Sequence, residues 1–475
     1  MSGIVTKLDS VITQLADLAD NPAFPYRTAV IWLSSLQTAW ELYVDRRQVP
    51  KFSIPFPPPE LKDHLKKDTF KKAQSYGRDK LNYSIAHTVY SFAVGLAFVY
   101  FGVFASTWDS VARFMARVGI ASSRTIVHSL LWMSYLTILP AIPGLAWSYY
   151  YNFVLEQKHG FNKSTVKLFI TDTLKTWLLT AVIGLPVLAG FLKIIDIAGK
   201  NFVAWLMLFL LGIQLILQII FPIFIQPLFN KFTPVPEGDL RNRVVALATK
   251  LKFPLTHLYV IDGSKRSSHS NAYFYGLPWS KRIVIYDTLI KESTPAEVEA
   301  VLAHELGHWY LSHPTRLILI AQGHLLFTLF IFSIFIHNKA LFEAFGFDPR
   351  LAVSSPTGGS QPVVIGFILY QLLFEPLDTV VKFFMNSKTR QYEYEADAFA
   401  VRLGFRKELG DALIKLHVNN LSAPHSDKLY SAYHRSHPTL PERLRAMDEY
   451  TGASWLKLSP KAKKQEIEEQ HKKED

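Results

Sequence analysis

The sequence predicts a mostly α-helical, polytopic membrane protein that carries an α+β metal-binding domain outside the bilayer. The first observation is composition, since 49% of the 475 residues are hydrophobic and only 19% are charged, which is too apolar for an ordinary soluble protein. The second is a series of long stretches without any charged side chain. The third is the motif H-E-x-x-H at 304–308, which on a helix puts two imidazoles one turn apart on one face.

Seven stretches are expected to cross the bilayer. Five of them contain no Asp, Glu, Lys or Arg and reach the roughly 20 residues that a span requires: 81–108, 125–155, 201–230, 317–338 and 351–374. The stretch 176–192 is shorter, contains a glycine and a proline, and lies near the lower limit for a span. The stretch 24–44 holds Arg27 and Glu41 near its ends, where long side chains can reach the interface.

The charges of the loops predict the orientation. Segment 45–80 carries ten lysines and arginines and segment 109–124 carries three, so the first loop is expected in the cytoplasm. If the loops alternate between the two sides of the membrane, the chain divides into five segments. Residues 1–230 hold spans one to five with the cytoplasmic loop 45–80, and 231–316 form a cytoplasmic segment. Spans six and seven lie in 317–386, a second cytoplasmic segment is 387–455, and 456–475 form a charged tail.

The last four residues, 472–475, read KKED. They resemble the dilysine retrieval signal of endoplasmic-reticulum membrane proteins, which is read in the cytoplasm, where the topology puts the tail. A merely solvated, charged tail is the alternative.

The composition also restricts the chemistry. The chain contains no cysteine, so any zinc must be held by histidine and carboxylate side chains. A net charge of +12 is compatible with nucleic-acid binding, but the basic residues alternate with apolar stretches and do not form one basic domain. A membrane surface accounts for them better, and no nucleic-acid partner is expected.

The H-E-x-x-H motif is expected on a well-capped helix. Thr294 suits the N-cap, Pro295 the first helical position, and Glu297 the return bond of a capping box. His304 and His308 then share one face and form a candidate pair of zinc ligands. Surface or core histidines are the alternative interpretation.

A third ligand is available in the sequence RQYEYEADAFA. Glu393 and Asp397 lie one helical turn apart in it, as a ligand and a supporting carboxylate would. Two spans separate His308 from Glu393, and an even number of crossings returns the chain to the same side. A plain amphipathic helix is the alternative for this stretch.

Three short runs before the motif predict a small sheet. They read LYVIDG, NAYFYG and RIVIYD, are rich in β-branched and aromatic residues, and are bounded by turn residues. An exposed edge of such a sheet can pair with an extended peptide. Ordinary strand packing is the alternative.

Most of the chain resembles the zinc-dependent CAAX prenyl proteases of the a-factor-converting type. The resemblance lies in EQKHGFNKSTVKLF, FIQPLFNKFTPVPEGDLR, SSHSNAYFYG, HELGHW, EYEADAFA and YHRSHPTLPERL. It implies seven long transmembrane helices that enclose a chamber, capped on the cytoplasmic side by a zinc metalloprotease domain of gluzincin type. It also implies residence in the endoplasmic-reticulum membrane, with some members in the inner nuclear membrane.

The resemblance assigns roles to individual residues. It implies His304, His308 and Glu393 as ligands of one Zn²⁺ and Glu305 as general base, which is consistent with a three-ligand site that leaves a position for water. The residues implied for the oxyanion and for the substrate-binding edge are His437, Arg443, Asn271, Ala272 and Tyr273. His434 and His425 compete with His437 for the first of these roles.

The expected activity is removal of the C-terminal tripeptide from isoprenylated CAAX proteins, with substrate and membrane lipid as partners. A further N-terminal cleavage in a prenylated precursor such as a mating pheromone is compatible with the resemblance. Two alternatives are a membrane quality-control zinc protease of the same clan and a multispan transport-associated protein with a structural zinc. Glu305 argues against the last, because a structural site needs no base.

Overall fold

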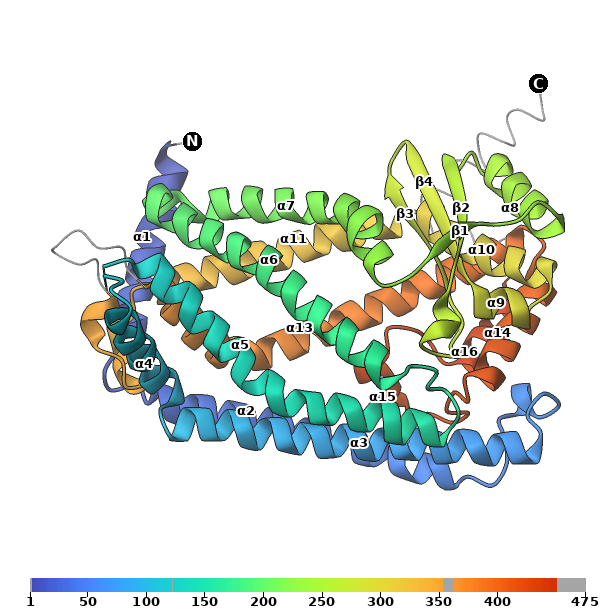
Figure 1. The fold of residues 1–475 in the computed structure, drawn as a ribbon, viewed down its shortest axis with the longest axis horizontal. Helices are drawn as coiled ribbons and strands as arrows, with labels where there is room; N and C mark the ends of the chain where they lie inside the picture. Colours follow the sequence, from blue (N-terminus) through green and yellow to red (C-terminus); the bar gives the residue numbers. More distant parts are fainter. Residues whose placement is uncertain (1, 122, 353–361, 451–475) are drawn as a thin grey trace.

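The computed structural model describes residues 2–121, 123–352 and 362–450. Long helices form an elongated body, and a small sheet with short helices lies at one end of it (Figure 1). The helices of the body are α1 (Ser2–Ala19), α2 (Tyr26–Gln48), α3 (Lys67–Tyr100), α4 (Val103–Arg117), α5 (Thr125–Tyr150), α6 (Val166–Ala198), α7 (Phe202–Ile220), α11 (His313–Phe335), α12 (Lys339–Ala344) and α13 (Val363–Arg402). This is the mostly helical, multispan architecture that the sequence predicts.

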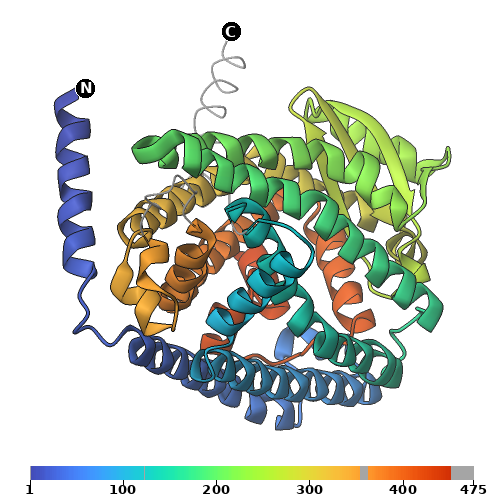
Figure 2. The same cartoon turned by 60° about the vertical axis from the view of Figure 1, so that its left-hand side comes forward.

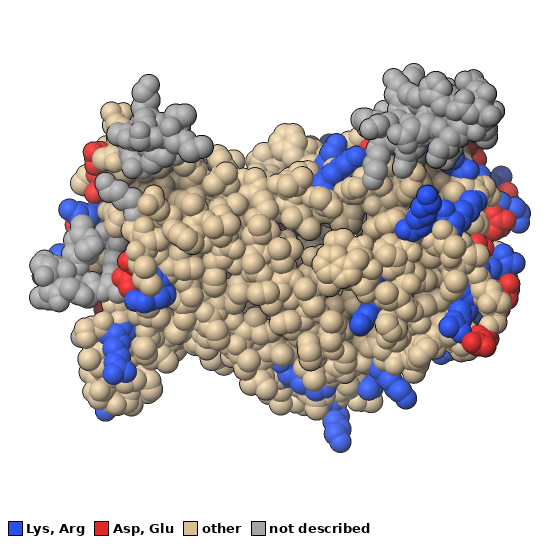
Figure 3. All heavy atoms as spheres, turned by 90° about the horizontal axis from the view of Figure 1, so that it is seen from above, with Lys and Arg blue, Asp and Glu red and all other residues tan. Residues whose placement is uncertain are grey.

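Six of the described helices are long and apolar enough to cross a membrane: α3, α5 with the turn that continues it to Glu156, α6, α7 with its continuation to Leu228, α11 and α13. No more than a third of the most apolar window of any of them is buried inside the protein, so their apolar side chains need lipid as a partner. Charged side chains concentrate towards the two ends of the face in Figure 3, and the broad band between them carries few.

The stretch 24–44, expected as the first of seven spans, lies largely in α2. This helix has 23 residues, which is enough for a span, but it is not among the six because charged residues make it less apolar. It packs along α3 and α13, and its Arg27 donates to the carbonyl of Tyr100. A seventh crossing by α2 therefore stays a prediction.

Two groups of helices lie on opposite sides of the body. In Figure 1, α2 and α3 run along one long side and α7 and α11 along the other, while α5, α6 and α13 run obliquely between them. The 60° turn in Figure 2 keeps α13 between these two sides. Buried aromatic and aliphatic side chains at the far end from the sheet, such as Trp132, Phe332 and Phe342, form the core of the helical body.

The span expected at 351–374 is the beginning of a longer element. Residues 353–361 lie outside the described part, and α13 then runs without interruption for 40 residues from Val363 to Arg402. The boundary expected between 386 and 387 therefore falls inside one helix, which carries an apolar segment at its start and Glu393 near its end.

The domain at the other end combines a four-stranded sheet with short helices. Its elements are β1 (Phe232–Pro234), α8 (Asp239–Lys250), β2 (Leu255–Ile261), β3 (Ala272–Leu277), β4 (Ser280–Tyr286), α9 (Asp287–Glu292), α10 (Pro295–Tyr310), α14 (Arg406–Asn419), α15 (Lys428–His434) and α16 (Leu440–Glu449). The strand order is β1-β2-β4-β3, with β2 and β4 parallel and the other pairs antiparallel. The three expected strands are present, β1 was not expected, and β3 forms one edge of the sheet.

Candidate metal centre

The helix α10 carries the motif, and its start is fixed as the sequence predicts. The Thr294 side chain accepts a bond from the Glu297 backbone N–H, and the Glu297 carboxylate accepts one from the Thr294 N–H at 2.8 Å. Lys415 on α14 also reaches Glu297 at 2.6 Å. The helix is largely buried between the sheet, α13 and α14, so its histidines have little freedom to move.

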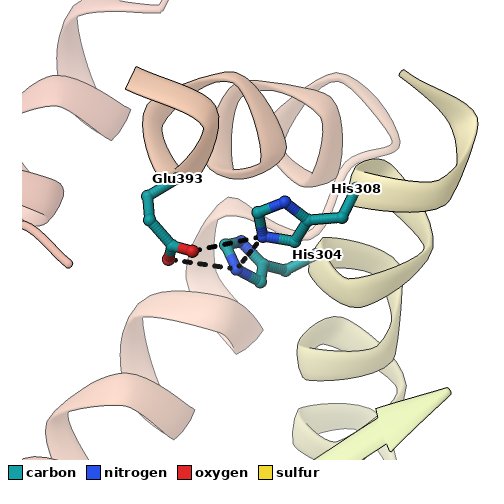
Figure 4. A group of neighbouring side chains, drawn as sticks. All are labelled: His304, His308 and Glu393. Carbon is teal, nitrogen blue, oxygen red and sulfur yellow. Dashed lines mark hydrogen bonds and ion pairs between the residues drawn. The ribbon is translucent and has the colours of Figure 1, made fainter. Parts of the chain in front are cut away.

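The expected ligands come together from two helices. His304 and His308 of α10 and Glu393 of α13 point towards one another (Figure 4). The Nε2 atoms of the two histidines are 3.3 Å apart, and they lie 3.5 Å and 3.3 Å from the two oxygens of Glu393. One ligand atom from each residue lies within 4.8 Å of the others, which is a separation that a single bound ion can span.

The chemistry of this group fits a metal ion. Two imidazoles and one carboxylate are a common donor set for catalytic zinc. The Oε2 atom of Glu393 is buried and has no hydrogen-bond partner among the described residues, and a buried carboxylate oxygen without a partner is costly. Burial lowers the pKa of His304, but the neighbouring Asp397 and Glu393 carboxylates outweigh this and raise it to about 9, so a metal has to displace a proton there.

Asp397 and Arg443 support His304 from behind. His304 donates from Nδ1 to the fully buried Asp397 at 2.9 Å, and this leaves its Nε2 atom facing the group. Arg443 donates from Nε and Nη2 to the two oxygens of Asp397 at 2.8 Å and 2.7 Å. Its Nη2 atom also lies 3.4 Å from Nδ1 of His304, and its Nη1 atom, which does not bind Asp397, lies 3.7 Å from Glu393 Oε2.

The support of His308 was not anticipated from the sequence. Its Nδ1 atom lies 2.9 Å from Nδ1 of His313, and Nε2 of His313 lies 3.0 Å from the buried carboxylate of Glu395. His313 also stacks on Tyr392. His313 and Glu395 both lie close to the motifs in the sequence. No spacing rule connects the start of α11 with α13, however, so no sequence signal indicates these contacts.

Glu305 is the residue predicted to act as the base. It follows the first ligand on α10, and its carboxylate makes no hydrogen bond or ion pair with the described residues. Burial raises the pKa of Glu305, and the nearby histidines oppose this rise. A raised pKa makes a carboxylate a stronger base, which suits the predicted role.

The structure separates the three candidate histidines of the C-terminal segment. His437 lies 3.3 Å from Glu393 Oε1, with a side chain that is 62% exposed and therefore accessible to a substrate. His434 instead contacts the buried Asp45 on α2 at 2.9 Å. His425 contacts the carbonyl of Phe56 at 2.7 Å. Of the three, His437 alone meets the ligand group.

The candidate substrate edge lies on β3. Ala272 and Tyr273 begin this edge strand, and Asn271 directly precedes it, with its side-chain oxygen accepting from the Ala272 N–H at 2.8 Å. The Tyr273 hydroxyl contacts the side chain of Gln226. The β3 strand packs against α10, the helix that carries His304 and His308.

Two protein-family models together match most of the chain. Residues 47–231 match the family described as the CAAX prenyl protease N-terminal domain with five membrane helices. Residues 234–451 match peptidase family M48. The boundary between the two matches falls just before and within β1, where the chain leaves the helical body for the sheet.

Individual relatives are similar over most of their length. CAAX prenyl protease 1 of Saccharomyces cerevisiae is 41% identical over 442 residues, 91% of this chain and 98% of the relative. The human CAAX prenyl protease 1 homolog is 38% identical over 458 residues, covering 88% and 94%. The crystal structure of Saccharomyces mikatae Ste24p superposes with a TM-score of 0.84 at 40% identity, covering 90% of this chain and all of that one.

Proposed function

Because the chain belongs to the CAAX prenyl protease 1 family of M48 metallopeptidases, we propose that it is a zinc endopeptidase that removes the C-terminal tripeptide from isoprenylated CAAX proteins. The observation that carries this proposal is the group His304, His308 and Glu393 beside an unpaired Glu305. Such a group combines a metal site with a base, which metal-assisted hydrolysis of a peptide bond uses.

Different residues have different roles in the proposed hydrolysis. A bound Zn²⁺ supplies a Lewis acid that brings the pKa of a water molecule towards neutrality. Glu305 takes the proton of the attacking water and passes it to the leaving amine. His437 donates to the negative charge that develops on the scissile carbonyl oxygen.

Arg443 has a more restricted role in this proposal than the sequence suggested. Two of its three nitrogens bind Asp397, so it chiefly holds the carboxylate that orients His304. Only Nη1 is left to face a substrate oxygen. The edge of β3, with Asn271, Ala272 and Tyr273, aligns the peptide by pairing with its backbone.

The membrane setting fits a prenylated substrate. The metal domain adjoins the ends of the apolar helices, so a lipid-modified chain end can reach it from the bilayer. A hollow of ≈ 270 Å³ between α2, α3 and α13 offers apolar surface within the helical body, and a larger enclosing chamber stays a prediction. We place the protein in the endoplasmic-reticulum membrane with the metal domain in the cytoplasm, as the basic loops indicate.

One experiment tests the proposal. Purified protein is incubated with a farnesylated CAAX peptide, with and without a zinc chelator, and the products are identified by mass. We expect a shortened prenylated peptide and a free tripeptide, both abolished by the chelator and restored by zinc. If zinc-containing protein leaves the peptide intact in every sample, the transport-associated alternative is favoured. If it cleaves only unprenylated unfolded proteins, a quality-control protease is favoured.

A further inference from the structure

Two adjoining hollows lie beside the metal group. The first, of ≈ 400 Å³, is lined by His437 and Arg443 together with His417. The second, of ≈ 600 Å³, is lined by Lys80 and by His269, which stands just before β3. Four residues line both hollows, namely Asn420, Ser422, Ala423 and Arg435.

Arg435 is the cation at this junction. Its backbone is extended (φ −109°, ψ 129°) and precedes His437 by two residues. The guanidinium lies 5.9 Å from the ring centre of Tyr430 and has no carboxylate within 4.0 Å among the described residues. A half-buried guanidinium without a counter-ion is unusual, because desolvating its charge is costly unless an anion compensates.

The neighbouring carboxylates are engaged elsewhere. Glu442 accepts from the Thr439 backbone and contacts Arg390. Glu156 accepts from Tyr76 at 2.6 Å and contacts His269 at 3.5 Å. Asp45 contacts His434, as described above. None of them is therefore available to neutralise Arg435.

A second polar group in the first hollow also lacks a partner. The Nε2 atom of His417 is buried and makes no hydrogen bond with the described residues. Burial and the charge of Arg435 lower the pKa of His417 to about 4, so the ring is neutral at physiological pH and can donate from one nitrogen. Lys80 adds a further positive charge from the second hollow.

We propose that this junction binds the C-terminal carboxylate of the substrate, with Arg435 as its main partner and His417 and Lys80 beside it. The inference rests on the proposed function, since it names the part of a CAAX substrate that the site reads. An anion at this place satisfies an unpaired guanidinium and an unpaired imidazole nitrogen together, and a guanidinium binds a carboxylate with two parallel bonds.

The place of Arg435 beside the metal group is consistent with the expected cleavage. Three extended residues separate the scissile bond from the chain end, a span of about 10 Å. Arg435 stands two residues from His437, whose ring contacts the ligand Glu393. His269 precedes β3 and lines the second hollow. A peptide that pairs with β3 and places its C-terminal end in this hollow therefore runs antiparallel to β3. Anchoring the chain end then fixes which peptide bond meets the metal.

The test compares two farnesylated CAAX peptides that differ only in the chain end, one with a free carboxylate and one with a carboxamide. For the wild-type protein we expect the amide to lower kcat/KM by about tenfold or more, mainly through KM, because a charge-assisted bond is lost on binding. In Arg435→Gln we expect the acid to be cleaved as slowly as the amide. Arg435→Lys should keep part of the preference.

The control is Arg113→Gln, which removes an exposed arginine on α4 at the opposite end of the body and should keep the full preference for the acid. Equal cleavage of acid and amide by the wild-type protein would overturn the inference and leave the proposed function intact. If folded Arg435→Gln still prefers the acid to the amide as strongly as the wild type does, another residue binds the carboxylate. Failure of the wild-type protein to cleave either peptide would refute the proposed function, and the inference with it.

Discussion

At the scale of single residues, each histidine ligand is held through the ring nitrogen that faces away from the metal group. His304 is fixed by Asp397 and His308 by His313. Spacing within α10 and α13, the even number of spans between them and the family resemblance together predicted the candidate ligands and Asp397. The contacts of His313 and Arg435 depend on which helices meet in space, and neither a period nor a motif in one segment carries that information.

Glu305 should be separable from the ligands. Glu305→Gln keeps the size of the side chain but cannot take a proton, so we expect turnover to fall by at least a hundredfold while bound zinc stays near one per chain. Zinc is measured by elemental analysis of the protein used in the peptide assay. In Glu393→Ala, the contrasting variant, zinc and activity should be lost together. Near-normal activity in Glu305→Gln would leave zinc with a structural role.

His437 should act on turnover. If it donates to the oxyanion, His437→Ala should lower kcat by about a hundredfold, with KM and zinc content little changed. His425→Ala is the matched control, because the His425 ring contacts the carbonyl of Phe56 and the ring of Phe70 and not the metal group. His434→Ala is less suitable, since it strips the buried Asp45 of its partner. Equal loss of activity in the His437 and His425 variants would contradict the assignment.

Asp397 should matter for stability as well as for metal binding. Asp397→Asn leaves the buried Arg443 without its charge partner, which typically costs about 3 kcal/mol or more in the free energy of unfolding. It should also weaken zinc binding by about tenfold to a hundredfold, because His304 loses its orienting acceptor. Chemical unfolding and chelator competition measure the two effects. Asp448→Asn, which breaks the more exposed pair with Arg406, should change stability by less than about 1 kcal/mol.

At the scale of elements, the local sequence predicted most of what is seen. Most charge-free stretches became helices, although 81–108 is divided between α3 and α4 and part of 351–374 lies outside the described residues. The helix α10 begins at its capping box, and the three β-rich runs became β2, β3 and β4. The strand β1 escaped notice because three residues carry no readable period. The continuity of α13 escaped notice because the change from apolar to charged residues looks like a domain boundary and Pro376 stands in it, yet the helix continues through both.

The N-terminus of α10 offers a test at this scale. Thr294→Ala removes the side-chain oxygen that accepts from Glu297 N–H, so we expect a loss of about 1 kcal/mol in the free energy of unfolding. Thr294→Ser keeps this oxygen and should behave like the wild type in the same unfolding experiment. An unchanged Thr294→Ala variant would mean that the contact between Glu297 and Lys415 alone secures the start of the helix.

At the scale of the whole molecule, the metal domain and the far end of the body lie on opposite sides of an apolar band. A glycosylation acceptor inserted beside Arg350, whose side chain is 88% exposed, should be modified in microsomes, because this end is expected in the lumen. An acceptor added after residue 475 should stay unmodified. Gel mobility before and after removal of glycans reports both. The reverse pattern would invert the orientation proposed for the chain.

The uninterrupted helix α13 has a mechanical consequence. Forty residues at 1.5 Å each make a helix of about 60 Å that contains Pro376, with exposed apolar side chains such as Val380 and Phe384 along its middle and the Glu393 carboxylate near its end. Bilayer thickness and acyl-chain order set the tilt of such a helix, and the carboxylate travels with it. The tilt of α13 therefore differs between different lipids or detergents. Kinetic constants measured in two such preparations describe the protein together with its solvent.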